Sequence, residues 1–232
     1  PTLMRIFIPK KTGGSVFLIP GKNYEVTFDL EKNRNRFDIL NGEKGQDIYK
    51  NNSILRSVYS ASKKFKTDLT PLQIQQNIVN QKEKELSIFQ IALQQNKLSQ
   101  TFYNFAKNER DSYYSAVLAQ VLLSKFHKST NPNNSILFSE TMKEFWEKSF
   151  EEYPVAQKHL LSSPYWFKYA KNYIEYKQYT AKDFSLDSLK KAYKNGLIHT
   201  QHINVAEKHL SGIFLENYKA AYIGKQSSQK RF

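Results

Sequence analysis

The chain has 232 residues, 40% of them hydrophobic, and a formal net charge of +14. This length and composition supply a packed core, and the charge favours acidic partners such as nucleic acid or an anionic membrane surface without bearing on the fold. The chain holds no cysteine, which excludes disulfides, thiolate metal sites and cysteine nucleophiles within it. No stretch approaches the roughly 20 apolar residues of a membrane span. The lysines form short pairs and no long basic block, so we interpret them as a solvated surface.

The amino-terminal region has the composition of β-strands. Residues 4–8 and 15–19 are rich in β-branched and aromatic side chains, and residues 24–29 alternate apolar and polar positions. Pro20 and Gly21 predict a type II turn, so the stretch from Gly13 to Asn33 predicts a strand-turn-strand hairpin. Residues 37–40 predict a further strand. So few strands are marginal alone, and we expect a helical face or strands before Pro1 to complete them.

From about residue 43 the apolar period becomes helical. Thr70 as N-cap and Pro71 at the first position mark one helix start, and Gly196 marks a helix end. The predicted helices cover residues 48–66, 71–93, 102–122, 139–153, 155–161, a segment that begins after Ser163 and Pro164, 186–194 and 203–223.

The predicted fold class is therefore mainly α, an irregular helical bundle with a small antiparallel β-unit at the N-terminus. Short polar loops between helices suggest antiparallel pairs, and no helical repeat is recognisable. We expect a β-hairpin unit at residues 1–42, which could be the end of a β-sandwich truncated here. A helical domain at residues 43–224 and a flexible tail at residues 225–232 would follow.

Histidines are the first candidates for chemistry, and the chain has five: His127, His159, His199, His202 and His209. His202 and His209 could share a helical face, with His199 nearby and Glu207 between them. A zinc site needs ligands at i and i+4 or from different elements, and no HExxH motif is present. We interpret the histidines as surface or cap residues, and a metal site stays the alternative.

Carboxylates and glycines give no catalytic motif. Glu144, Glu147, Glu151 and Glu152 lie among lysines at helical spacing, which is typical of surface pairs. A facing acid/base couple cannot be recognised from one sequence. The pairs Gly13-Gly14 and Gly42-x-x-Gly45 lack the lysine and hydroxyl of a phosphate loop. We therefore assign no catalytic, cofactor-binding or metal-binding residue and no cofactor.

Aromatic and basic residues alternate at 165–171 and 173–179, which invites a nucleic-acid interpretation. Single-strand binders combine stacking rings with a positive groove. Rings at helical spacing more often fill a core, with lysines extending around it. We favour the core interpretation. Replacement of Trp166 by alanine distinguishes the two, because loss of the fold indicates a core residue and weaker binding by a folded chain indicates a stacking platform.

The amino-terminal region resembles the accessory region that precedes the redox domain in envelope-anchored thiol-disulfide oxidoreductases of the thioredoxin-like superfamily. Those proteins often end a β-sandwich with the pattern F-x-L/I-x-P-G-x-x-Y-x-V/I-x-F/D. The matching residues here are Phe17, Ile19, Pro20, Gly21, Tyr24, Val26 and Phe28. Gly42, Gly45 and residues 46–59 are similar to the helical segment that follows. The resemblance covers the hairpin and the first helix, while the later helices match only in kind.

The resemblance implies a non-catalytic region that positions the redox domain or contacts client proteins in the periplasm or cell envelope. The catalytic W-C-x-x-C of the family is absent from this chain, so no redox role passes to any residue. The implied partners are a client protein or a covalently linked thioredoxin-like domain, and a second copy could pair through the β edge. The alternative is a basic helical module that binds single-stranded nucleic acid or an acidic protein.

Overall fold

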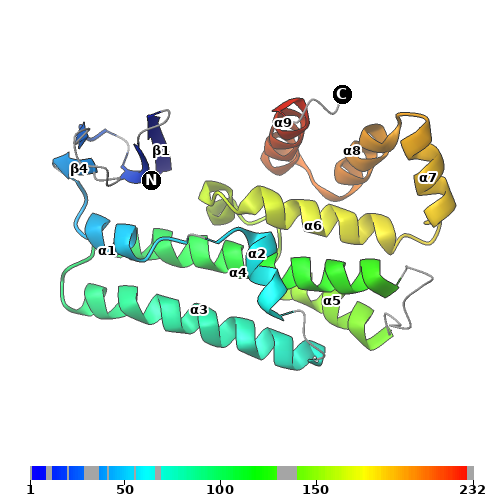
Figure 1. Ribbon diagram of the computed structural model, residues 1–232, viewed down its shortest axis with the longest axis horizontal. Helices are drawn as coiled ribbons and strands as arrows, with labels where there is room; N and C mark the ends of the chain where they lie inside the picture. The colour runs from blue at the N-terminus through cyan, green and yellow to red at the C-terminus, as the bar shows by residue number, and fades with distance from the viewer. Residues whose placement is uncertain are drawn as a thin grey trace. The chain divides into compact units, whose positions relative to one another are not determined.

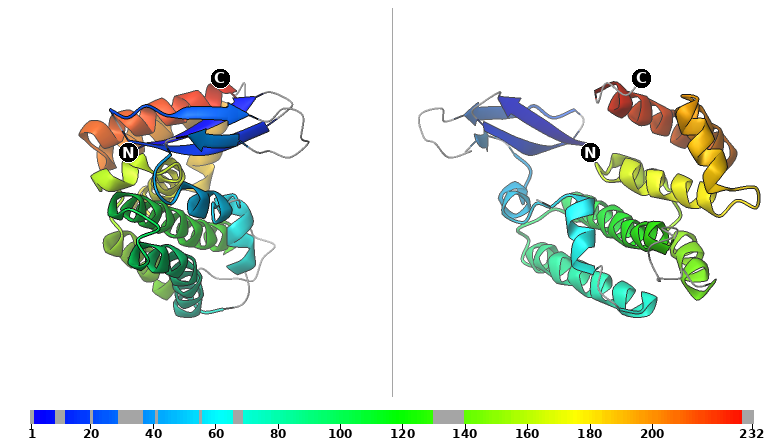
Figure 2. Two further views of the ribbon diagram at one scale, coloured as in Figure 1. Left: turned by 90° about the vertical axis from the view of Figure 1, so that its left-hand side faces the viewer. Right: turned by 45° about the vertical axis from the view of Figure 1, so that its right-hand side comes forward.

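The computed structural model describes residues 2–8, 12–19, 21–28, 37–40, 42–54, 56–65, 69–129 and 140–228 (Figures 1 and 2). These residues form a mainly helical bundle of irregular build that is preceded by antiparallel strands, so the predicted fold class is confirmed. No helix in this part of the chain is both long and apolar enough to cross a membrane. Residues 130–139, between two of the predicted helices, lie outside the described residues.

The chain divides into two compact units. The first unit comprises residues 1–56 and 79–111, and the second comprises residues 57–78 and 112–232. The strands and the first helix thus share a unit with parts of two long helices that continue into the other unit. The expected domain boundary after residue 42 stays a prediction.

The strands of the first unit are β1 (Thr2–Ile8), β2 (Thr12–Leu18), β3 (Glu25–Phe28) and β4 (Phe37–Leu40). β1 pairs antiparallel with β2, and β3 pairs antiparallel with β4, in two separate two-stranded sheets. The strand positions agree with the sequence pattern. The predicted hairpin from Gly13 to Asn33 is wrong, however, because β2 and β3 pair with other strands.

The turn between β2 and β3 is present although the hairpin is not. The Lys22 N–H donates to the Ile19 carbonyl (3.3 Å), and Gly21 has φ of +83°. The Ile19 N–H donates to the Tyr24 hydroxyl (2.9 Å) rather than to a neighbouring strand. A side chain therefore takes the backbone donor that a β2–β3 ladder would have used at this point.

The helix expected at residues 48–66 is interrupted. The structure forms α1 (Gln46–Asn51), α2 (Val58–Ser62) and the 3₁₀ turn η1 (Lys63–Phe65). Asn52 ends α1: its side-chain amide donates to the Ile48 carbonyl (2.8 Å), and its own carbonyl accepts from Arg110 Nη2 (2.5 Å). Ser57 then caps α2 by accepting from the Ser60 N–H (3.1 Å). The prediction of one helix was wrong because a distant arginine binds the carbonyl at the break.

Two long antiparallel helices, α3 (Pro71–Gln94) and α4 (Gln100–Ser129), follow. Thr70 begins α3 as predicted, since Gln73 N–H donates to its hydroxyl (3.3 Å) while Thr70 N–H donates to the Gln73 side chain (2.9 Å). The predicted interruption near residue 95 is confirmed, with Asn96 at φ of +55°. The core of the first unit is formed by Tyr49, Phe89, Ala92, Leu98, Phe102, Phe105 and Ala106.

The remaining helices belong to the second unit. They are α5 (Glu140–Glu152), the 3₁₀ turn η2 (Lys158–Ser162), α6 (Trp166–Tyr179), α7 (Leu186–Lys194), α8 (Ile198–His209) and α9 (Gly212–Ser228). Trp146 of α5 packs on Tyr176 of α6, with ring centroids 4.8 Å apart. Asn172 of α6 donates to the Ala116 carbonyl of α4 (3.3 Å), which ties these helices together. In Figure 1, α8 and α9 lie along one side of α6, and α7 packs against α8.

The carboxyl-terminal helices differ from the prediction. The single helix expected at residues 203–223 is two helices, separated where Leu210 is extended (φ −123°, ψ 152°) and buried. α9 continues through Gly224 to Ser228, so residues 225–228 are helical and not part of a flexible tail. Packing of Tyr222 and Gln226, both buried, offsets the roughly 0.5–1 kcal/mol cost of an internal glycine. Residues 229–232 lie outside the described chain.

Candidate functional site

Two of the residues that carry the family resemblance, Ile19 and Tyr24, form a hydrogen bond near the junction between the strands and α1. Tyr24 accepts from the Ile19 N–H and donates to Glu43 Oε1 (3.0 Å). Lys22 Nζ donates to the same carboxylate oxygen (2.7 Å). Glu43 directly precedes the turn into α1, so one carboxylate ties the turn after β2 to the start of the helix.

Gly45 completes this junction. It has φ of +105°, and a Cβ added there would lie 2.0 Å from Leu98 Cδ1. Leu98 belongs to the core of the first unit. Glycine is therefore required at this position both for its backbone conformation and for close packing. Gly45, which lies outside any phosphate-loop motif, therefore has a structural role.

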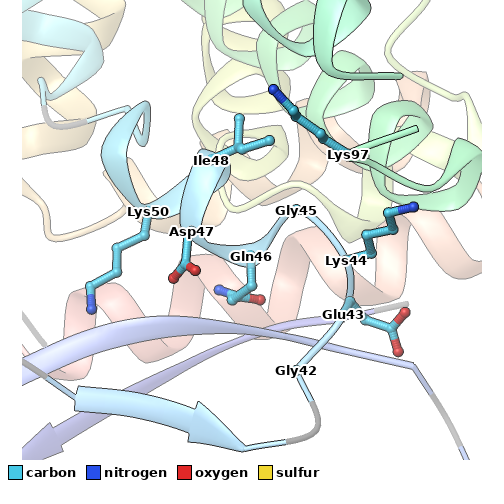
Figure 3. A pocket seen from close by; sticks show the side chains of 9 residues that line it. All are labelled: Gly42, Glu43, Lys44, Gly45, Gln46, Asp47, Ile48, Lys50 and Lys97. Atoms are coloured by element: carbon cyan, nitrogen blue, oxygen red, sulfur yellow. The ribbon is translucent and has the colours of Figure 1, made fainter. Parts of the chain in front are cut away.

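A pocket of about 410 Å³ opens at the junction, lined by residues 42–48, Lys50 and Lys97 (Figure 3). The side chains of Lys44, Lys50 and Lys97 extend in different directions in this view, and Glu43 is already bound to Lys22 and Tyr24. α1 has only six residues and offers little helix dipole. The pocket thus lacks the convergent polar groups that define a binding site.

A second set of polar residues is buried in the first unit, and the sequence interpretation missed it. The Arg110 side chain is 0% exposed and the Glu109 side chain 2% exposed, on the part of α4 that faces the core. Arg110 Nη1 donates to Glu109 Oε2 (3.2 Å), and its guanidinium lies 4.3 Å above the Phe89 ring. Arg110 Nε lies 3.6 Å from Glu85 Oε2.

The same network extends along α4. The Tyr49 hydroxyl donates to Glu109 Oε1 (2.7 Å). Lys82 and Lys107 both donate to Asp111, at 2.9 Å and 2.7 Å. Each buried charge has an opposite partner, which is the arrangement that makes burial of charge tolerable. The sequence did hold a signal: Glu109 and Arg110 lie four residues after Phe105 and Ala106, on the same apolar face.

The histidines do not assemble a metal site. In the described part of the chain, no group of three or more histidine and carboxylate side chains could hold a metal ion. His159 is exposed on η2, and His127 of α4 contacts the Tyr179 ring (5.3 Å). His202 and His209 do not act together, because His202 is buried and His209 is exposed at the end of α8.

His202 is a correction to the surface interpretation. Its Nε2 lies 2.6 Å from the Tyr218 hydroxyl, and its ring stacks on Tyr222 (4.7 Å). His199 Nδ1 lies 2.9 Å from the Tyr222 hydroxyl. Two histidine–tyrosine pairs thus join α8 to α9. Neither spacing nor composition revealed them, since the tyrosines lie 16 and 23 residues away.

Burial lowers the pKa of His202 to about 4, an effect that Glu175 opposes and that Lys171 and His199 reinforce. On α6, burial also lowers the pKa of Lys168 to about 8, with Lys171 reinforcing the effect. Lys171 forms an ion pair with Glu175, whose Oε2 atom is buried without a hydrogen-bond partner. The α6–α8–α9 interface thus combines a neutral, buried histidine with an ion pair on α6.

The other candidates take structural positions. Trp166 is 4% exposed and Tyr169 is 1% exposed, and Trp166 Nε1 donates to the Val155 carbonyl (3.0 Å). The α6 rings therefore belong to the core, as the core interpretation predicted. Of the carboxylates on α5, Glu144, Glu147 and Glu151 are exposed, and Glu152 accepts from Gln75 (3.1 Å). They lie on the surface, as the sequence interpretation expected.

Comparison with known proteins does not assign the chain to a family. No protein-family model, no curated protein and no solved structure matches it.

Proposed function

We propose that this chain is a non-catalytic accessory region of a thioredoxin-like thiol-disulfide oxidoreductase of the periplasm or cell envelope. Its task is to position a covalently linked redox domain or to contact client proteins. The observation that supports the proposal is the junction between β2 and α1. Ile19, Gly21, Tyr24 and Gly45, which carry the resemblance, all have defined structural tasks there.

The junction suits a positioning role because it links strands and helices through several independent contacts. The Glu43 carboxylate joins two side chains of the turn, and Gly45 allows close packing against Leu98. The Glu43 side chain is 9% exposed, so its charge-assisted hydrogen bond from Lys22 is partly shielded from water. A connection made of several contacts suits a region that holds a neighbouring domain in a fixed orientation.

The alternative, a basic module for single-stranded nucleic acid or an acidic protein, has the net charge of +14 in its favour. Its stacking platform is not supported, since Trp166, Tyr169 and Tyr176 are buried. Attraction between lysines and phosphates would have to supply the binding without these rings. Such binding falls steeply as the salt concentration rises.

The first test is to sequence the parent reading frame on both sides of the chain. A W-C-x-x-C domain after Phe232 supports the proposal, and a stop codon directly after Phe232 overturns the redox connection. If the domain is present, its resolving cysteine is replaced by serine and mixed disulfides with clients are trapped, with and without residues 1–232. An unchanged set of trapped clients and an unchanged trapping rate would overturn the accessory role.

A salt series tests the alternative. Binding of a labelled single-stranded oligonucleotide is followed by fluorescence anisotropy at increasing salt concentration. Tight binding at low salt with a steep linear loss on the logarithmic scale would favour the basic-module interpretation. Binding that stays weak at low salt removes it.

A further inference from the structure

A pocket of about 260 Å³ lies in the second unit, where the ends of α6 and α8 meet the start of α7. Its apolar lining comes from Phe184, Leu189 and Val205, and its polar lining includes Ser188 and Asn204. Ser185 begins α7 at the pocket edge, where its hydroxyl accepts from the Ser188 N–H (3.1 Å).

Three basic residues line this pocket: Lys177 from α6, and Lys208 and His209 from α8. Burial lowers the pKa of His209, and the charges of Lys177 and Lys208 lower it further. The Lys177 ammonium lies 5.6 Å from the Tyr173 ring centroid, and the His209 ring lies 6.3 Å from the same ring.

These cations lack the carboxylate partners that other lysines of the unit have. Lys171, Lys190 and Lys219 each form an ion pair. Within the described residues, neither Lys177 nor Lys208 has a carboxylate oxygen within 4.0 Å, the ion-pair limit. Asp183 is the carboxylate among the lining residues, so the lining holds three basic residues and one acid.

Stabilisation of the helix dipoles accounts for part of this arrangement. Lys177 lies in the last turn of α6, and Lys208 and His209 lie in the last turn of α8, where cations stabilise the helix dipole. Stabilisation of the helix dipoles does not require the ends of α6 and α8 to line the same pocket, where their cations repel one another. A bound anion would offset the repulsion and use the hydroxyl and amide donors of the lining.

The size of the pocket restricts the occupant. A volume of about 260 Å³ is below the roughly 300–1,000 Å³ of typical cofactor and drug-sized sites. A pocket of this volume has room for one acidic and one apolar side chain. The lining offers basic residues to the first and apolar residues to the second. A protein segment presents these two groups together.

We propose that this pocket binds an acidic peptide segment of a client protein, with a glutamate or aspartate carboxylate between Lys177, Lys208 and His209. A neighbouring apolar side chain of the peptide packs against Phe184, Leu189 and Val205. This inference rests on the proposed function, because only that function makes the bound partner a client protein. It adds the chemistry of the segment that the partner presents.

The test uses the whole chain and a fluorescein-labelled peptide that alternates glutamate with leucine. Anisotropy at low salt should show saturable binding, and an isosteric peptide with glutamine in place of glutamate should bind at least about tenfold more weakly. The double variant Lys177→Gln/Lys208→Gln should lose about tenfold in affinity. Ser188→Trp, which fills the pocket without changing the charge, should lose as much.

Lys191→Gln/Lys194→Gln is the matched control. It removes the same charge from the last turn of α7, and neither residue lines the pocket. Its affinity should stay within about twofold of the parent chain. Circular dichroism confirms that each variant keeps its helical content.

Several outcomes overturn the proposal. The first is a parent chain that does not bind the acidic peptide, and the second is an equal loss of peptide affinity in the control variant. The third is succinate binding as tight as peptide binding, which would assign the pocket to free carboxylates. Binding of a single-stranded oligonucleotide that depends on Lys177 and Lys208, without peptide binding, would assign it to phosphates. If the parent frame encodes a redox domain but the chain does not bind the peptide, the pocket proposal fails and the accessory role stands. If the chain binds the peptide but the parent frame encodes no redox domain, only the redox connection fails.

Discussion

The two units of the chain bury polar groups in opposite ways. The first unit buries ionised side chains and pairs each of them, as with Arg110 and Glu109 on α4. The second unit buries titratable groups at the α6–α8–α9 interface, where burial favours the neutral form of His202. An opposite partner makes a buried charge tolerable, whereas a buried neutral histidine makes stability fall as the pH drops below its pKa in the unfolded chain.

The largest expected effect comes from removing the central cation of the first unit. Arg110→Met leaves Glu109 buried without its arginine and frees the Asn52 carbonyl that ends α1. Breaking a buried pair on one side costs about 3–5 kcal/mol. Urea denaturation followed by far-ultraviolet circular dichroism measures the loss of unfolding free energy.

Lys107→Met is the control for Arg110→Met. Lys107 also pairs with an acid on α4, Asp111, but its side chain is 49% exposed, so a loss of at most about 1 kcal/mol is expected. Trp146 and Trp166 both lie in the second unit, so tryptophan fluorescence follows that unit separately. An Arg110→Met chain as stable as the parent would contradict the role of pairing in the first unit.

The second prediction concerns His202 in the other unit. Its pKa is about 4 in the folded chain and about 6.5 in the unfolded chain. The unfolded chain therefore binds more protons between these values, so the unfolding free energy falls as pH drops from about 6.5 to about 4. A difference of this size corresponds to about 3 kcal/mol at most.

The groups that face His202 from the surrounding helices set the size of this effect. They are Lys171 and Glu175 of α6, His199 of α8, and Tyr218 and Tyr222 of α9. Urea denaturation followed by tryptophan fluorescence at several pH values gives the slope, and His202→Gln should flatten it. His159→Gln replaces an exposed histidine and is the control. The pKa values of His127 and His209 are also lowered, so part of the slope should persist in His202→Gln, and a slope as steep as that of the parent chain contradicts the assignment.

Two tyrosines give the closest matched comparison between the units. Tyr49→Phe removes the hydroxyl that donates to the Glu109 carboxylate (2.7 Å), and Tyr218→Phe removes the hydroxyl bound to the neutral His202 ring (2.6 Å). A hydrogen bond to a charged group contributes about 1.5–3 kcal/mol, and one between neutral groups about 0.5–1.5 kcal/mol. Tyr49→Phe should therefore lower the unfolding free energy more. A larger loss for Tyr218→Phe would reverse the comparison.

Local signals in the sequence identified many elements of the fold. Thr70, Pro71 and Gly196 marked helix ends correctly, because capping and positive φ depend on residues close in the chain. Strand pairing could not be obtained this way, since the Pro20-Gly21 turn is compatible with β2 pairing to β1 instead of β3. The end of α1 depends on Arg110, 58 residues away from Asn52.

The candidate sites were less accessible to prediction for the same reason. The acidic-peptide pocket takes residues from α6, α7, α8 and a connecting segment, and each lysine alone looks like an ordinary helix-end cation. The buried charges of α4 could have been suspected from their position on an apolar face. The resemblance to thioredoxin-like accessory regions stays a prediction.

The smallest expected effect compares two histidines of α8, His202 and His209. His209 is exposed, it lines the pocket together with Lys177, Lys208 and Asp183, and its ring contacts that of Tyr173. A peptide carboxylate would stabilise the protonated imidazole, so peptide binding takes up a proton. Affinity should then rise about threefold from about pH 8 to about pH 6, and fall again near about pH 4 as the peptide glutamates are protonated.

Anisotropy titrations at each pH measure this dependence. His209→Gln should keep the binding at high pH and lose the rise, because the imidazolium is absent. His202→Gln should keep the rise, since His202 is buried between α8 and α9 and does not line the pocket. An affinity that decreases between about pH 8 and about pH 6, or a rise that survives in His209→Gln, would remove His209 from the site and leave the two lysines as its only cations.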